Sequence, residues 1–152
     1  MLVLSRPAMA IQNLSFLVAA LNPPEQLELA VVPVIDGLLL ADLVTEFEAR
    51  FGYQPAGGYG GVVFAFGSID PLDNFLGISS ETFLLGCDCG ELGCWPLCCC
   101  VRHEGEMTEW TNFSQPHRPD RDYSAFGPFR FEGRQYREAI SSLSAQLASS
   151  RP

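Results

Sequence analysis

The hydrophobic and polar positions along the first third of the chain predict short strands joined by a tight turn. Apolar residues dominate residues 11–18 and residues 27–35. The pair Asp36-Gly37 follows the second run and tolerates the positive φ angles of a two-residue turn, so we expect a hairpin there. Pro33 cannot donate a ladder hydrogen bond, which predicts an edge strand or a bulge at that position.

A short helix should follow this hairpin, because apolar residues recur at helical spacing from Leu40 to Phe51. The glycine-rich segment 57–61 then leads into an apolar strand at 62–66. A phosphate-binding loop has the opposite order, since it follows a strand, opens a helix and carries a lysine or a G-x-G-x-x-G pattern. We therefore interpret the glycine segment as a turn with close backbone packing.

In the second half of the chain, the segment TFLLG at 82–86 leads into the cysteines, and the next residues predict a hairpin with strands at 97–103 and 106–113. Residues 68–80 carry proline and asparagine turn signals, and residues 115–128 form a loop rich in proline, arginine and aspartate. The last predicted element is a helix over 133–149. Its apolar residues fall on one stripe: Tyr136, Ile140, Leu143 and Leu147.

These elements predict an α+β fold with a mostly antiparallel sheet, a short internal helix and a C-terminal amphipathic helix packed on one face. A length of 152 residues fits one domain spanning residues 1–152. Residues 1–10 are either part of this domain or a disordered lead-in, and the pattern leaves both alternatives open.

The amino-acid composition excludes several classes of function for this chain. Apolar residues make up 47% of the chain and charged residues 18%, which excludes intrinsic disorder. The formal net charge is −9 and the chain has no lysine, so we expect no nucleic-acid binding through phosphate contacts. Since no apolar run reaches the length of a membrane span, we expect no membrane insertion. The acidic surface predicts a basic or neutral protein partner, or self-association through an exposed sheet edge.

All six cysteines lie within fourteen residues, at positions 87, 89, 94, 98, 99 and 100. The cysteines of a disulfide framework are spread along a small secreted chain, whereas the cysteines of this chain are clustered in one segment. Polar residues interrupt the apolar stretch near the N-terminus, and no clean cleavage site follows it. We therefore expect a cytoplasmic protein with free or metal-bound thiols.

Three motifs make the chain similar to a known family. They are C-D-C-G-E-L-G-C-W-P-L at 87–97, W-T-N-F-S-Q-P-H-R at 110–118 and Y-S-A-F-G-P-F-R-F at 123–131. Together they resemble a bacterial protein family without an assigned activity, over about residues 83–143. The resemblance implies no particular reaction. Because the chain departs from the family pattern at 98–100, it implies that any functional thiols are Cys87, Cys89 and Cys94.

These three cysteines with His117 would form a Cys₃His set, which suits a closed, structural zinc site. The spacings C-x-C and C-x₄-C differ from the paired C-x₂-C units of common zinc sites. A second alternative is a thiol pair that cycles between dithiol and disulfide. Asp88 and Glu91 would raise the pKa of neighbouring thiols and so disfavour that chemistry.

Two catalytic arrangements are weaker alternatives: His117 with Asp120 and Asp122 as ligands of a hard metal, or Cys94 with His117 as a nucleophile and its base.

Structural roles compete with all of these functional ones. Gln115, His117 and Arg118 would also serve to hold the long loop to the sheet through hydrogen bonds, and Trp110 would serve as core packing. Cys98 to Cys100 suit buried strand positions. The sequence thus predicts a small binding domain without catalytic turnover, with a zinc-stabilised or thiol-redox module as the alternative.

Overall fold

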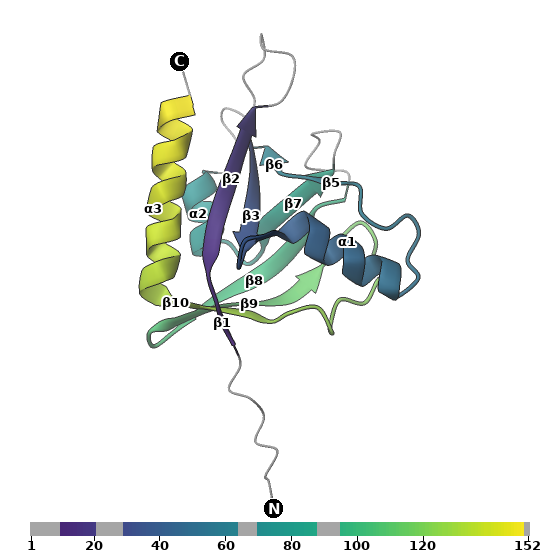
Figure 1. Cartoon of the computed structure of the whole chain (residues 1–152). Helices are drawn as coiled ribbons and strands as arrows, with labels where there is room; N and C mark the ends of the chain where they lie inside the picture. The colour runs from purple at the N-terminus through teal and green to yellow at the C-terminus, as the bar shows by residue number, and fades with distance from the viewer. Residues whose placement is uncertain (1–9, 21–28, 64–69, 88–94, 151–152) are drawn as a thin grey trace, which may run out of the picture.

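The computed structural model describes residues 10–20, 29–63, 70–87 and 95–150 and has an α+β architecture (Figure 1). Its helices are α1 (Leu40–Arg50), α2 (Pro71–Leu76) and α3 (Gly133–Ser150). Its strands are β1 (Ile11–Gln12), β2 (Leu14–Ala20), β3 (Leu29–Ile35), β4 (Leu38–Leu39), β5 (Tyr59–Gly60), β6 (Val62–Val63), β7 (Thr82–Cys87), β8 (Leu97–Glu104), β9 (Met107–Ser114) and β10 (Phe129–Glu132).

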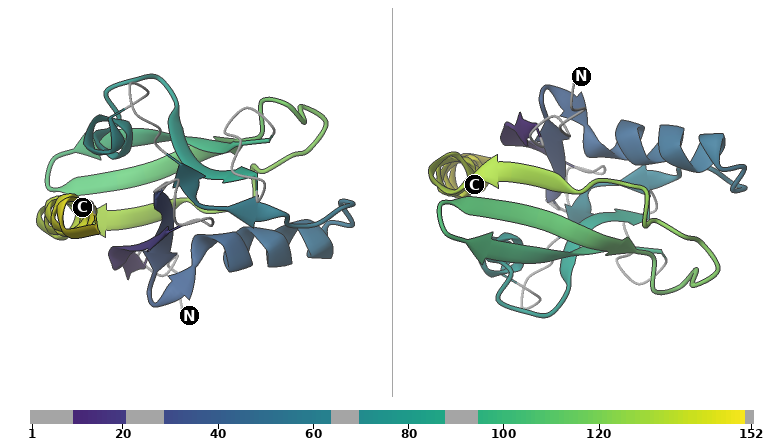
Figure 2. Two further views of the ribbon diagram at one scale, coloured as in Figure 1. Left: turned by 90° about the horizontal axis from the view of Figure 1, so that it is seen from above. Right: turned by 90° about the horizontal axis from the view of Figure 1, so that it is seen from below.

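The strands form a curled, mostly antiparallel sheet. One hydrogen-bonded group has the order β1-β10-β9-β8-β7-β5, and the other has the order β2-β3-β4, with β6 also paired to β3. Only the β1–β10 pair is parallel among the described strands. Because β1 runs into β2 and β5 runs into β6 with one residue between them, the two groups are joined at both edges (Figures 1 and 2).

The predicted first hairpin is confirmed, with one correction. Asp36 and Gly37 have φ angles of 53° and 80° and link Ile35 to Leu38 in a two-residue turn. The edge strand or bulge expected at Pro33 is wrong, because β3 is the middle strand of its group and pairs with β2 without a register shift at that residue. On the side away from β2, strand β6 pairs with residues 30–31 of β3, and strand β4 pairs with residues 34–35. Pro33 lies between these two partners, so on that side no strand pairs with it and a proline is tolerated.

The sequence analysis missed several elements, among them strand β5, which lies inside the glycine segment 57–61 predicted as a turn and pairs with β7. Within the segment 68–80, predicted as turns, residues 71–76 form the helix α2, with Asp70 as its N-cap, Pro71 in its first turn and a left-handed Gly77 at its end. The end of the predicted loop leads into strand β10, which pairs with β9 and β1. The single strand expected at 11–18 is instead β1 and β2, separated at Asn13.

The C-terminal helix α3 covers one face and the free edge of β2 (Figure 1). Its predicted stripe is buried, with Leu143 fully inaccessible to solvent. The Gln135 side chain accepts from the Leu14 backbone N–H and donates to the Leu14 carbonyl, so it replaces a strand partner there. No helix in the described part of the chain is long and apolar enough to cross a membrane.

Candidate functional site

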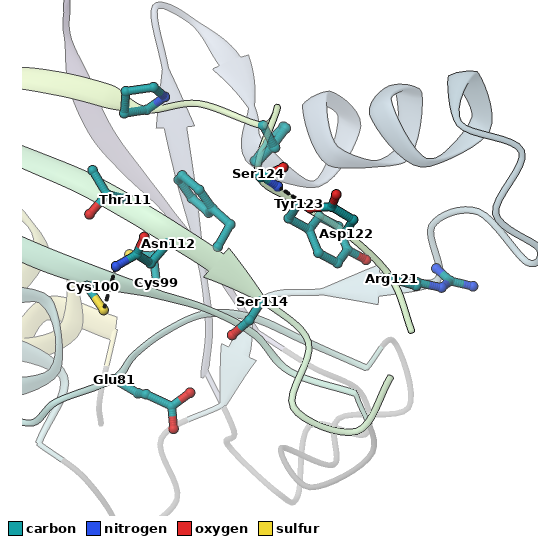
Figure 3. Close-up of a pocket in the computed structure, with 13 residues that line it drawn as sticks. Glu81, Cys99, Cys100, Thr111, Asn112, Ser114, Arg121, Asp122, Tyr123 and Ser124 are labelled. Carbon is teal, nitrogen blue, oxygen red and sulfur yellow. Dashed lines mark hydrogen bonds between the residues drawn. The ribbon is translucent and has the colours of Figure 1, made fainter. Parts of the chain in front are cut away.

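A surface pocket of about 630 Å³ lies where β8 and β9 meet the loop that precedes β10 (Figure 3). Its floor contains three buried aromatic rings, those of Phe113, Tyr123 and Phe126. Its rim carries hydrogen-bonding side chains: Glu81, Thr111, Asn112, Ser114, Asp122 and Ser124. An apolar floor with a few polar groups around it is the usual lining of a ligand-binding pocket.

A β-bulge shapes the strand wall of this pocket. Cys98 pairs with Ser114 and Cys100 with Thr111, so two residues of β9 lie opposite the single residue between those cysteines. One of them, Asn112, has a φ angle of 54°. Asparagine is among the few non-glycine residues that adopt this left-handed conformation readily. Because the bulge redirects the strand, the Asn112 amide nitrogen lies 3.9 Å from the Cys100 sulfur at the pocket wall.

Behind the pocket lies a buried group of polar residues, here called the Glu48 cluster: Glu48, Tyr59, Gln115, Arg121 and Tyr123. Glu48 comes from α1 and is fully inaccessible to solvent. Its carboxylate accepts hydrogen bonds from the hydroxyls of Tyr59 and Tyr123, the latter at 2.5 Å. The Gly57 backbone N–H, at 2.8 Å, and the Gln115 amide, at 3.3 Å, also donate to it. The carboxylate therefore has several partners despite its burial.

Arg121 supplies the opposite charge in this cluster. Its guanidinium Nη1 lies 3.4 Å from the Glu48 carboxylate, and its side chain is only 6% exposed. A second guanidinium nitrogen donates to the Pro55 carbonyl at 2.9 Å, and the group lies over the ring of Tyr53. In Figure 3 the guanidinium points away from the other labelled residues of the pocket. Arg121 therefore neutralises Glu48 instead of presenting its charge to the pocket.

The two tyrosines of the Glu48 cluster act as hydrogen-bond donors at neutral pH. Burial raises the pKa of Tyr123 to about 12, and the hydrogen bond to Glu48 acts in the same direction. Burial also raises the pKa of Tyr59 above its ordinary value. Since Tyr123 belongs to both the cluster and the pocket floor, the cluster fixes the position of that floor.

The predicted metal ligands are only partly within the described residues. Cys89 and Cys94 lie outside them, as does the side chain of Cys87, whose backbone pairs with Tyr59 at the end of β7. His117 is exposed on the loop after β9. Across residues 10–20, 29–63, 70–87 and 95–150, no three His, Cys, Asp or Glu side chains are grouped closely enough to hold a metal ion. The zinc and redox hypotheses stay predictions.

The other candidate residues have distinct places. Gln115 is buried and joins the Glu48 cluster, so it does hold the loop to the rest of the domain, as the structural alternative predicted. The Arg118 guanidinium lies over the ring of Trp95, 4.3 Å from its centroid. Trp110 is fully buried and donates to the Tyr136 hydroxyl at 2.9 Å, which is a core role. Cys98 and Cys99 are buried strand residues, and Cys100 is half-buried at the pocket.

Sequence reasoning missed Glu48, Tyr59 and Tyr123. One signal was present: Glu48 follows Val44 by four residues and therefore lies on the buried stripe of α1. A carboxylate on such a stripe indicates a buried ion pair or hydrogen-bonded cluster. Its partners could not be identified from sequence, because they come from β5 and from the loop after β9.

Comparison with models of protein families, with curated proteins and with solved structures found no match to this chain. The resemblance to a bacterial family, drawn from the motifs above, therefore stays a prediction.

Proposed function

We propose that this chain is a small binding domain that holds a segment of a partner protein in the pocket formed by β8, β9 and the loop before β10. The observation that carries the proposal is the combination of an apolar floor and a hydrogen-bonding rim in one pocket of about 630 Å³. Such a lining favours an extended ligand with both apolar and polar parts.

The Glu48 cluster supports a binding role for this pocket. Tyr123 lies in its floor and donates to a fully buried carboxylate that also contacts Arg121. A floor fixed in this way loses little conformational freedom when a ligand binds. The half-buried thiol of Cys100 has only the Ser80 carbonyl and the Asn112 amide as hydrogen-bond partners among described residues. Neither partner is a base, so these contacts favour binding over nucleophilic catalysis.

A variant in which a bulky side chain blocks the pocket tests this proposal. Peptides selected from a displayed random library against the full chain are expected to bind Ser124→Trp at least tenfold more weakly, because the indole would occupy the rim. Affinity would be measured by calorimetry. Ala125→Trp is the matched control, since Ala125 is exposed, adjacent and outside the pocket lining. Both variants should unfold at the wild-type temperature, because exposed substitutions change stability by roughly 0.5 kcal/mol or less. Equal binding by all three proteins, or no selected peptide, would contradict the proposal.

A second candidate function is a zinc-stabilised or thiol-redox module that uses Cys87, Cys89, Cys94 and His117. Its support is the placement of residues beside these ligands. The Trp95 indole, one residue after Cys94, donates to the Gly58 carbonyl at 3.3 Å, and Gly58 precedes the strand partner of Cys87. Arg118, one residue after His117, lies on the Trp95 ring. The chain neighbours of Cys94 and His117 are thus in contact, and Trp95 lies next to the strand that pairs with Cys87.

Metal content measured together with a thiol count would test this candidate. For a zinc module we expect close to one zinc per chain in protein purified anaerobically without a histidine tag, and three thiols that react only after chelation. Structural zinc contributes roughly 10–16 kcal/mol in peptide systems, so chelation should also unfold the domain. Cys94→Ser should lose the metal and the control Cys100→Ser should keep it. A redox module would instead show no metal and a reversible disulfide. No metal, no disulfide and six reactive thiols in unfolded protein would contradict both forms.

A further inference from the structure

The rim of the pocket carries two carboxylates that are not neutralised. Glu81 makes no hydrogen bond or ion pair with any residue that the structure describes. Asp122 accepts a hydrogen bond from the Ser124 backbone N–H at 2.8 Å, which lowers the pKa of that carboxyl. In the view of Figure 3, Ser114 lies between these two acids. The pocket therefore presents negative charge from two separate segments of the chain.

The cation that lines the pocket does not offset this charge. Arg121 is committed to Glu48, to the Pro55 carbonyl and to the Tyr53 ring, and in Figure 3 its guanidinium points away from the other labelled pocket residues. Among the described lining residues it is the sole basic one. The rest of the rim consists of hydroxyl and amide groups, which supply further hydrogen-bond acceptors: Thr111, Asn112, Ser114 and Ser124.

The position of Glu81 is fixed by its neighbours. The adjacent Thr82 is buried, and its hydroxyl donates to the Asn74 carbonyl at 2.9 Å. The Asn74 side chain in turn bonds both the N–H and the carbonyl of Phe83, each at 2.9 Å. These contacts attach the start of β7 to α2 and hold the Glu81 backbone at the pocket edge.

We propose that the pocket binds an arginine or lysine side chain of the partner protein, with the charged head group at the Glu81 and Asp122 rim and the methylene stem on the aromatic floor. This inference rests on the proposed binding function and names its ligand class. Long basic side chains combine an apolar stem with a charged end, which matches the division between floor and rim. The net charge of −9 also favours the approach of a basic partner.

Four short peptides test the inference against the full chain. They share the frame acetyl-Gly-Gly-Xaa-Gly-Gly-amide, with Arg, Lys, Gln or Glu as the central residue. Binding is followed by amide NMR shifts of Ser114 and Ser124. We expect saturable shifts with the Arg and Lys peptides and none with Gln or Glu. Glu81→Gln should weaken binding of the basic peptides by about three- to fivefold, as expected for loss of one exposed ion pair. Glu132→Gln, an exposed acid outside the pocket, should leave binding unchanged.

The outcomes separate this inference from the proposed function. If the Gln or Glu peptide shifts the same amides as strongly as the Arg peptide, the pocket binds peptides without charge selection, and the basic-side-chain inference is overturned. Equal binding of the basic peptides by wild type and Glu81→Gln also overturns it. If none of the four peptides binds while library-selected peptides still bind and still fail on Ser124→Trp, the inference fails and the binding function stands.

Discussion

Replacing Glu48 with alanine is expected to lower the free energy of unfolding by about 3–5 kcal/mol, the cost of removing one partner from a buried ion pair. The substitution would leave the Arg121 guanidinium buried without its counter-charge. It would also remove the acceptor for the Tyr59 and Tyr123 hydroxyls, and each unsatisfied buried donor costs about 1–3 kcal/mol. The loss is large because net domain stability is only about 5–15 kcal/mol.

Urea unfolding followed by circular dichroism would measure this effect. Glu46→Ala is the matched control, because Glu46 lies on the same helix and pairs with Arg50 at 3.0 Å, but on the exposed face. That exposed pair should contribute at most about 0.5 kcal/mol. A similar decrease in the free energy of unfolding for the two variants would show that burial of the Glu48 carboxylate has no special role in stability. A folded Glu48→Ala protein should also bind library-selected peptides more weakly, since the support for Tyr123 is removed.

Replacing Leu143 with aspartate is expected to unfold the domain. Leu143 is fully buried on α3, among the core residues that this helix packs against β2 and β9. An isolated carboxylate among these buried apolar side chains loses its hydration. Together with the lost packing of a leucine, itself roughly 2–5 kcal/mol, the cost is comparable to the total stability of the domain.

Circular dichroism and size-exclusion chromatography would detect this unfolding. Ser144→Asp is the matched control, because Ser144 is the next residue of α3 and its side chain is exposed. It should retain the wild-type spectrum and elution volume. A folded, monodisperse Leu143→Asp protein would show that α3 contributes little to the core.

The elements predicted from the sequence were those with a local signal. The first hairpin follows from Asp36-Gly37, since only a few residue types adopt two successive positive φ angles. The stripe from Tyr136 to Leu147 predicted α3 because a helix of 3.6 residues per turn brings those positions together. The helix α2 had comparable signals at Asp70 and Gly77, but the proline and asparagine within it suggested turns instead.

The elements missed or misplaced depend on distant partners. Strand β10 has only four residues and forms between β9 and β1, which are far apart along the chain. The place of Pro33 in a middle strand is possible because two short strands pair on either side of it. Neither arrangement has a signature within a window of ten residues, because the stabilising hydrogen bonds are made to other segments.

The same distinction applies to the candidate sites. The cysteine segment was singled out because its residues are contiguous, and its role as a zinc or thiol site stays a prediction. The pocket combines Glu81, the bulge at Asn112 and the loop at Asp122, which are separated along the chain. The carboxylate that supports the pocket floor, Glu48, belongs to yet another segment of the sequence, the helix α1.

The amino-acid sequence by itself determined the α+β class, the first hairpin, the amphipathic α3 and the acidic character of the chain, because periodicity, turn chemistry and charge are properties of local sequence. Tertiary structure alone decided which polar groups meet. Burial of Glu48 is favourable only because Tyr59 from β5, and Arg121 and Tyr123 from the loop after β9, converge on it. A buried carboxylate requires such partners, and only the folded chain brings them within hydrogen-bond distance.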